Sequence, residues 1–277
     1  MNDIRPLAMV TGASSGIGFE LARQLAERGF DLVINAEDHD RLRAAARRIR
    51  QEAGTSVEAV PADLRRYDEA ERFYDTVTAT GRPVAVAVLN AGVGQGGAFV
   101  DTDLADDLEI VDLNVRSTVH LAKRVLRDMA ADGEGHVLVT SSIASTVPGS
   151  FQAVYNASKS FLQSFAQALR NELKETGVTV TALMPGPTET DFFRRADMED
   201  TKVGRQDKDD PAQVARQGLD ALFAGKDKIV AGSLKTRAQG LVNKVLPDRT
   251  KAQAHRRMAE PGSGEGSGDA SRVEGRP

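Results

Sequence analysis

The stretch TGASSGIG, residues 11–18, decides the fold. It follows an apolar run at residues 7–10 and opens a segment in which Ile17, Leu21 and Leu25 recur at helical spacing. Glycine at positions 12, 16 and 18 suits a tight turn, a diphosphate close to the backbone, and close helix packing. Because a helix N-terminus presents free N–H groups to an anion, we predict a dinucleotide-binding loop. The predicted contacts are Gly12, Ser14, Ser15, Gly16, Ile17 and Gly18; an ordinary glycine-rich turn is the alternative.

Short apolar runs alternate with longer helical segments along most of the chain. The runs are residues 7–10, 32–35, 57–60, 84–89, 136–140 and 178–183. They are near-continuous in apolar character, which is typical of strands buried on both faces. We therefore predict an α/β fold with a Rossmann-type doubly wound parallel sheet of about seven strands, in three α/β/α layers and one domain. Such sheets bind ligands beyond the carboxyl ends of their strands.

The composition of the 277 residues excludes several classes of function. The chain is 40% hydrophobic and 27% charged, and its net charge of −4 gives no support to nucleic-acid binding. With no cysteine there is no disulfide, thiol nucleophile or cysteine-based zinc site, and the four histidines lack metal-ligand spacing, so no metal is expected. The longest apolar stretch, residues 84–89, is too short to span a membrane, and the first six residues show no signal pattern. We expect a cytoplasmic protein.

The C-terminal part divides into two segments. Residues 234–258 carry seven Lys or Arg against one acid, Asp248, with apolar residues between them. We favour a helical hairpin broken at Pro247 that packs beside a substrate pocket over an amphipathic segment that binds a membrane or a partner. Ten of the nineteen residues from 259 to 277 are Gly, Ser or Pro, which predicts a disordered tail.

Further motifs follow the glycine loop in a fixed order. They are Leu-Asn-Ala-Gly at residues 89–92, Asn114, Ser142, Tyr155-x-x-x-Lys159, and Pro-Gly-Pro-Thr-Glu-Thr at residues 185–190. With the loop, they resemble the short-chain dehydrogenase/reductase family from residue 7 to about 193. Leu89 stands where the family has Asn, which puts a local turn contact in doubt and leaves the chemistry intact.

Tyr155 and Lys159 are four residues apart in a predicted helix at residues 153–173, so they share one helical face. A neighbouring ammonium lowers the pKa of a phenol, which makes Tyr155 a candidate general acid/base. The hydroxyl of Ser142 is placed at a strand end, where it can donate to a substrate oxygen. The alternatives are a surface Lys beside a half-buried Tyr, and a Ser that caps a turn.

The family resemblance implies the rest of the mechanism. It implies a kink at Asn114, which holds a water that links Lys159 to solvent; a mid-helix Asn bonded to its own backbone is the alternative. Together these residues predict an NAD(P)-dependent enzyme that interconverts a carbonyl and a secondary alcohol by hydride transfer. A non-catalytic dinucleotide-binding sensor or scaffold is the alternative function.

The resemblance also implies the other cofactor contacts. Thr188 and Thr190, with Pro185 and Gly186, would bind the carboxamide; both threonines also suit helix N-caps. Asp63, with Leu64, would contact adenine, or serve as a turn acid. The segment Asn90, Ala91 and Gly92 would lie near a ribose of the cofactor. Lys159, which lies beside Tyr155, would also bind a ribose.

An acid at the end of the second run bears on the choice of cofactor. Glu37 can bind the 2′-hydroxyl of NAD, and with Asp38 it would repel the 2′-phosphate of NADP, so NAD is slightly favoured. Arg41 and Arg43, one helical turn later, can offset that repulsion.

The substrate is expected to be a small carbonyl compound or alcohol. Its predicted contacts are Ser142, Gln95, Phe151, Gln152, Phe192 and Phe193. The resemblance implies a lid at about residues 187–210 within a catalytic domain of residues 1–233. It also implies a homodimer or homotetramer, through the outer faces of residues 107–129 and 153–173.

Overall fold

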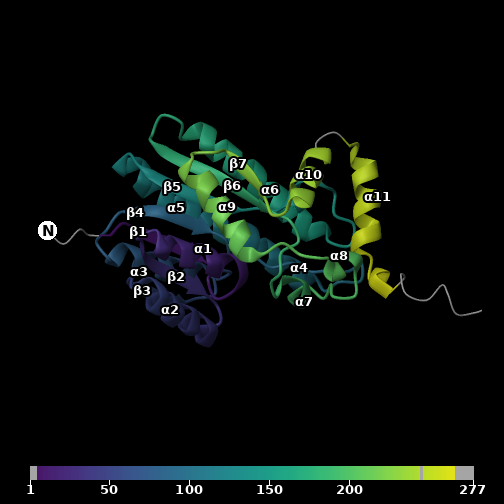
Figure 1. Ribbon diagram of the computed structural model, residues 1–277, viewed down its shortest axis with the longest axis horizontal. Coiled ribbons are helices and arrows are strands. Elements are labelled where there is room, and N and C mark those ends of the chain that lie inside the picture. Colours follow the sequence, from purple (N-terminus) through teal and green to yellow (C-terminus); the bar gives the residue numbers. More distant parts are fainter. Residues whose placement is uncertain (1–4, 244–245, 266–277) are drawn as a thin grey trace, which may run out of the picture.

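The computed structural model describes residues 5–243 and 246–265. Its centre is one parallel sheet of seven strands in the order β3-β2-β1-β4-β5-β6-β7, so the predicted fold class is confirmed (Figure 1). The strands are β1 (Leu7–Thr11), β2 (Asp31–Ala36), β3 (Val57–Pro61), β4 (Val84–Leu89), β5 (Gly135–Thr140), β6 (Val178–Pro185) and β7 (Lys228–Ala231). The first six coincide with the predicted runs to within one or two residues at each end.

Helices cover both faces of the sheet. They are α1 (Gly16–Glu27), α2 (His39–Ala53), α3 (Tyr67–Ala79), α4 (Leu104–Ile110), α5 (Ser117–Asp132), α6 (Ala153–Glu172), α7 (Phe192–Arg195), α8 (Lys202–Arg205), α9 (Pro211–Phe223), α10 (Leu234–Val242) and α11 (Asp248–Ala259). Helices α1, α2 and α9 pack on one face, and α3, α5 and α6 pack on the other.

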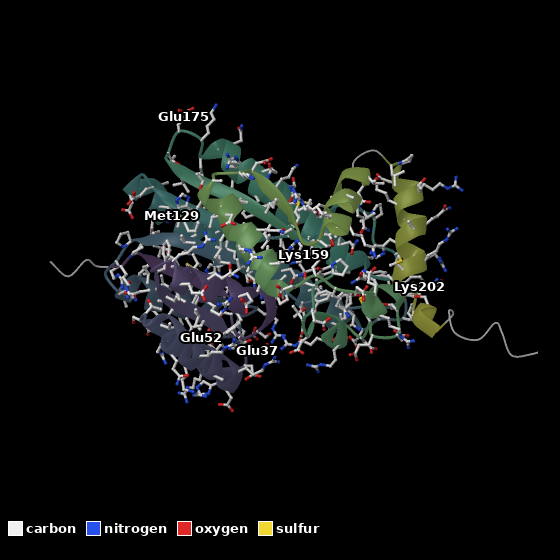
Figure 2. All side chains as sticks on the ribbon, in the orientation of Figure 1. Glu37, Glu52, Met129, Lys159, Glu175 and Lys202 are labelled. Atoms are coloured by element: carbon white, nitrogen blue, oxygen red, sulfur yellow. The ribbon has the colours of Figure 1, made fainter. Side chains whose placement is uncertain are left out.

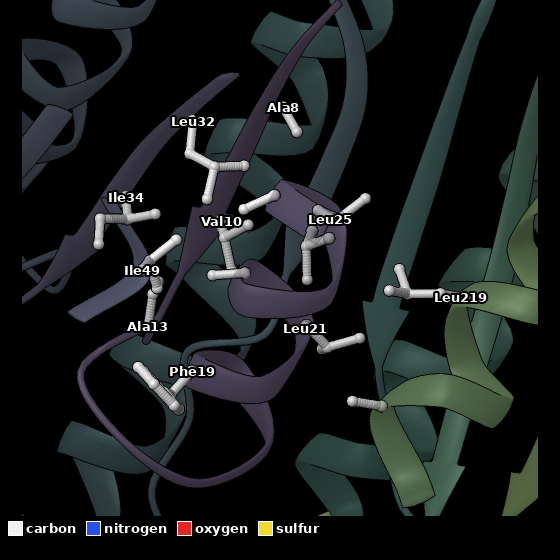
Figure 3. Packing of buried hydrophobic residues seen from close by; sticks show 14 of the residues in the cluster. Ala8, Val10, Ala13, Phe19, Leu21, Leu25, Leu32, Ile34, Ile49 and Leu219 are labelled. Carbon is white, nitrogen blue, oxygen red and sulfur yellow. The ribbon is translucent and has the colours of Figure 1, made fainter. Parts of the chain in front are cut away.

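Alternate side chains of each strand enter opposite cores. In β1, Ala8 and Val10 pack with α1, whereas Leu7 and Met9 face the second core. Figure 3 shows Val10 beside Leu25 in the first of these cores. This two-sided burial explains why the strands are apolar throughout instead of alternating with polar residues.

The strand order places the glycine loop at the switch point of the sheet. The chain leaves β1 for β2 on one side and later returns to β4 on the other side of β1. Loops that follow β1 and β4 therefore diverge and leave a crevice at the carboxyl edge.

One predicted helix is interrupted. Between α4 and α5 the chain forms a π-helix, η1 (Val111–Arg116), which contains Asn114. The structure thus has an irregular turn where the family resemblance implied a kink, and π-helical turns occur frequently at functional sites.

The C-terminal helices α10 and α11 lie at the end of the molecule opposite the N-terminus, with the lower end of α11 near α8 (Figure 1). The prediction of disorder from residue 259 is wrong for residues 259–265. Ala259 ends α11 in a buried position, and the backbone N–H groups of Gly262 and Gly264 donate to the side chain and the carbonyl of Asp200. The remainder of that predicted tail, residues 266–277, lies outside the described residues. No helix in the described part is long and apolar enough to cross a membrane.

Candidate active site

A cavity of about 880 Å³ opens at the carboxyl edge of the sheet. All of the predicted cofactor contacts line it. They are Gly12, Ser14, Ser15, Gly16, Ile17, Gly18, Glu37, Asp63, Leu64, Asn90, Ala91, Gly92, Tyr155, Lys159, Pro185, Gly186, Thr188 and Thr190. Residues up to 178 positions apart in the sequence thus share one wall, because every strand of a parallel sheet ends at this edge.

The glycine loop has the shape that a dinucleotide requires. Gly12 and Gly16 adopt left-handed backbone conformations, with φ of +67° and +57°. A Cβ on Gly16 would lie 2.8 Å from the Cγ2 atom of Thr190, and one on Gly18 would lie 2.1 Å from the carbonyl oxygen of Gly12. Side chains are therefore excluded where a diphosphate approaches the start of α1, so the residues present fit the cofactor.

Asn90 holds the ends of three strands together. Its side-chain amide donates to the carbonyl of Thr11, at the end of β1, and its side-chain oxygen accepts from the hydroxyl of Thr140, at the end of β5. The Thr11 hydroxyl also accepts from the backbone N–H of Asn90 and of Ala91. Asn90 thus fixes the floor of the crevice.

Ser142, Tyr155 and Lys159 converge on the central part of the cavity. The Ser142 hydroxyl hydrogen-bonds to the phenol and also caps a short helix, η2 (Ile143–Thr146), by accepting from the backbone N–H of Ala144. The ammonium of Lys159 lies 5.8 Å from the centre of the Tyr155 ring and donates to the carbonyl of Thr140 at 3.0 Å. Figure 2 shows Lys159 in the interior of the molecule, where its residue is only 5% exposed.

The pKa values differ from the sequence expectation. Burial raises the pKa of Tyr155 to about 12, opposed by its hydrogen bond to Ser142. Burial also lowers the pKa of Lys159 to about 8. The phenol pKa is therefore raised in the protein alone, against the expectation that it is lowered, because loss of water around the phenol outweighs the hydrogen bond with Ser142.

Asn114 is completely buried behind the cavity wall. Its side-chain oxygen accepts from the backbone N–H of Val93, and its side-chain amide donates to the carbonyl of Val93 and to the Ser158 hydroxyl. Ser158 in turn donates to the carbonyl of Tyr155. Asn114 thus bonds to a neighbouring loop and to α6 instead of to its own helix backbone, and it borders Gly92 opposite Lys159.

Acids gather at the end of the cavity near β2 and β3. One guanidinium, that of Arg65, donates to Asp63 at 2.7 Å, to Glu37 at 2.5 Å and to Glu109 at 2.8 Å. Sequence reasoning missed Arg65, which nothing but its position two residues after Asp63 would have indicated. Arg41 is paired with Asp191 at 2.6 Å, so it does not offset the charge of Glu37.

The substrate end of the cavity is lined by four of the six predicted residues, Ser142, Gln152, Phe192 and Phe193. Phe192 packs on the Tyr155 ring, with ring centres 5.1 Å apart. Gln95 and Phe151 are not among the residues that line the described part of the cavity wall. Phe151 packs against the small cluster of Phe193, Ala196, Met198 and Ala259.

Sequence reasoning expected a C-terminal helical hairpin beside a substrate pocket, but it named none of the residues that line the cavity there. This wall comes from α10, α11 and their junction, and its polar members include Asn243, Lys251 and His255. The four-residue spacing of Lys251 and His255 on a basic helix was the available signal. No group of residues suited to a metal ion occurs within residues 5–243 and 246–265.

Comparison with known proteins decides the family. A family model described as short chain dehydrogenase matches residues 6–201. The chain belongs to the short-chain dehydrogenase family. It is therefore an oxidoreductase that acts on CH–OH groups and uses NAD(P).

Several similar proteins are known. A putative ketoacyl reductase of Streptomyces coelicolor is 36% identical over 188 residues, which cover 66% of this chain and 71% of that protein. A short-chain dehydrogenase from Sphingobium yanoikuyae, solved in complex with NADPH, has a TM-score of 0.76 and 29% identity over 87% of this chain and 96% of its own. An alcohol dehydrogenase from Comamonas testosteroni, specific for bulky-bulky ketones, has a TM-score of 0.74 and 26% identity over 88% of this chain and 96% of its own.

Proposed function

We propose that this dehydrogenase interconverts a carbonyl compound and a secondary alcohol, with Tyr155 as the general acid/base. The carrying observation is that the Tyr155 phenol, the Ser142 hydroxyl and the Lys159 ammonium meet in the same cavity as the glycine loop. When bound, NAD(P) supplies or accepts the hydride. The protein supplies the proton and holds the reacting carbon beside it.

Each side chain has a separate task in this proposal. Tyr155 gives its phenolic proton to the carbonyl oxygen in reduction and takes it back in oxidation. Ser142 hydrogen-bonds to the same oxygen and stabilises the charge that develops on it. Lys159 stabilises the phenolate electrostatically and binds a ribose hydroxyl. Asn114 is a positioning residue that fixes the Val93 loop and α6.

We propose a preference for NAD over NADP. Glu37, Asp38 and Asp63 line the adenosine end of the cavity, and the guanidinium of Arg65 beside them is shared by three carboxylates. A 2′-phosphate of nearly two negative charges would be repelled there. Binding of NADPH is known for the Sphingobium relative, so this preference belongs to residues of this chain.

We propose that residues 1–233 form the catalytic domain and that the helices after it complete the substrate pocket. Apolar side chains on α4 and α6 remain exposed, among them Leu104, Leu108 and Phe161. They support association into a homodimer or homotetramer, which light scattering on the purified protein would measure.

The test of the catalytic proposal is Tyr155→Phe, with Tyr67→Phe as the matched control because Tyr67 is 70% exposed. We expect Tyr155→Phe to lose turnover of carbonyl compounds by at least ~10²-fold while it still binds the dinucleotide. Full turnover in this variant would refute the proposal. Tight dinucleotide binding by the unaltered protein, without turnover of any aldehyde, ketone or alcohol in a broad panel, would favour a sensor instead.

A further inference from the structure

The substrate end of the cavity is closed by residues that lie beyond the matched family region. The family model ends at residue 201, whereas α10 and α11 begin at Leu234 and Asp248. Lys251 and His255 of α11 line the cavity together with the apolar side chains of Leu246 and Met258. This wall therefore lies outside the matched family region, and its residues are those of this chain.

Hydrogen bonds fix the position of this wall relative to Ser142. The Lys251 ammonium donates to the carbonyl of Thr146 at 3.1 Å, and the Asn243 amide donates to the Thr146 hydroxyl at 3.0 Å. The Nδ1 atom of His255 lies 2.9 Å from the carbonyl of Ser150. All three contacts are made to the loop that follows Ser142, so the position of Lys251 is fixed relative to the site of proton transfer.

The cavity is electrically polarised. The acids Glu37, Asp38 and Asp63 lie at the adenosine end, and a fourth lining acid, Asp191, is paired with Arg41 and Arg195. Lys235 and Lys251 line the wall at the opposite end. The side chain of Lys251 is only 13% exposed, and its carboxylate partner, Asp248 at 2.7 Å, is 79% exposed. A solvent-exposed carboxylate neutralises a cation only weakly, and an ammonium with two bonds retains a third N–H donor.

The distance from this cation to the reaction centre is bounded by the chain. Thr146 follows Ser142 by four residues through the 3₁₀ helix η2. At ~2 Å of rise per residue plus the 3.1 Å hydrogen bond to Thr146, the ammonium lies within roughly 11 Å of Ser142. The apolar side chains of Val147 and Phe192 line the same cavity. The space thus suits an aliphatic chain with a reacting carbonyl at one end and a negative group at the other.

We propose that the substrate is a carbonyl compound with a remote carboxylate, and that Lys251 binds this carboxylate as a specificity-determining residue. Lys235 is exposed, so the largely buried ammonium of Lys251, beside the uncharged side chain of Asn243, is the cation best placed for a substrate group. One such ammonium matches one negative charge better than a phosphate of nearly two. The proposal rests on the proposed function, because it assumes that the carbonyl is placed at Tyr155.

The experiment compares a homologous series of methyl-ketone carboxylates of increasing chain length with the corresponding methyl esters. Turnover of both series is measured for the unaltered enzyme, Lys251→Gln, Lys251→Arg, and the control Arg249→Gln. Arg249 is an exposed residue of the same helix that lies outside the described cavity wall, so the control removes the same charge. We expect the enzyme to prefer the acid at one chain length by roughly tenfold or more in kcat/KM. Lys251→Gln should abolish this preference, chiefly through KM, while Arg249→Gln keeps it and Lys251→Arg restores part of it.

Equal losses for acids and esters in Lys251→Gln would show that Lys251 only anchors α11, and would overturn the proposal. An unaltered enzyme that turns over esters as well as acids would do the same. If no carbonyl compound is turned over, the proposed function fails separately. Calorimetric titration with the same acids then decides the role of Lys251. If Lys251 binds the carboxylate, the affinity for the acid should fall at least about tenfold in Lys251→Gln and stay unchanged in Arg249→Gln.

Discussion

Replacing the buried lysine of the active site should make the protein more stable while it destroys activity. Lys159 is 5% exposed, and burial lowers its pKa from 10.5 to about 8. At neutral pH the charged form is therefore held in the folded protein at a cost of about 3 kcal/mol, since each pKa unit corresponds to 1.36 kcal/mol. Lys159→Met removes this cost, and it also removes the hydrogen bond to Thr140, worth about 1 kcal/mol. We expect a net gain of about 2 kcal/mol at pH 7.

The gain should depend on pH in one direction. Between about pH 8 and 10.5 the unfolded chain binds the lysine proton and the folded chain does not. The free energy of unfolding of the unaltered protein therefore rises with pH across this window, and the advantage of Lys159→Met shrinks. Above this window only the loss of the hydrogen bond remains, so the variant becomes slightly less stable than the unaltered protein.

Urea unfolding at a series of pH values, followed by circular dichroism because the chain has no Trp, measures both effects. Lys174→Met, at a lysine whose side chain is 65% exposed, is the control and should change stability by less than about 0.5 kcal/mol. A Lys159→Met protein that is less stable at pH 7, or whose advantage is the same at pH 7 and pH 10, would refute the reasoning.

Three further predictions concern the cavity. Gly18→Ala places a methyl group 2.1 Å from the Gly12 carbonyl, so calorimetry should show dinucleotide binding weakened by roughly tenfold or more, whereas Gly225→Ala, with no atom near its new methyl, should bind normally. Glu37→Gln should raise the ratio of kcat/KM for NADPH to that for NADH by roughly fivefold, the size of about 1 kcal/mol; an unchanged ratio would contradict the role of Glu37. Ser142→Ala should lower kcat by roughly 10²-fold in steady-state kinetics with little effect on the dinucleotide KM, and a loss confined to that KM would place Ser142 at the cofactor instead.

Local patterns were sufficient to predict the sheet and the glycine loop. Near-continuous apolar runs define strands in a sheet with two covered faces, and glycine spacing fixes the turn before α1. The cavity-lining motifs could also be predicted, because each follows directly after a strand. Contacts set by long-range packing could not be predicted from the sequence. Phe151 follows the same strand as Ser142, yet with a backbone φ of +64° it packs against the cluster that contains Met198 and does not line the described cavity wall.

The wall formed by α11 shows the same limit. The sequence indicated a basic helical hairpin near a pocket, but the contacts of Lys251 and His255 join residues more than a hundred positions apart. No local pattern encodes such a contact. Arg65 is a similar case, since its partner Glu37 lies 28 residues earlier on a neighbouring loop.

The two buried titratable groups of the site lead to a single physical conclusion about the reaction. Burial favours the neutral form of both Tyr155 and Lys159, and it shifts their pKa values apart, from nearly equal ordinary values to about 12 for the phenol and about 8 for the ammonium. In the protein alone the proton therefore stays on the phenol, which suits the proposed role of Tyr155 as a general acid in reduction of a carbonyl. Oxidation of an alcohol needs the phenolate, so additional positive charge must reach the phenol from the bound reactants. The lack of water that raises the phenol pKa also strengthens the attraction between any such charge and the phenolate, because electrostatic energies grow as the local dielectric constant falls. Burial at this site thus has two linked effects. It makes the charged Lys159 destabilise the fold, and it makes the pKa of Tyr155 sensitive to charge at the reaction centre.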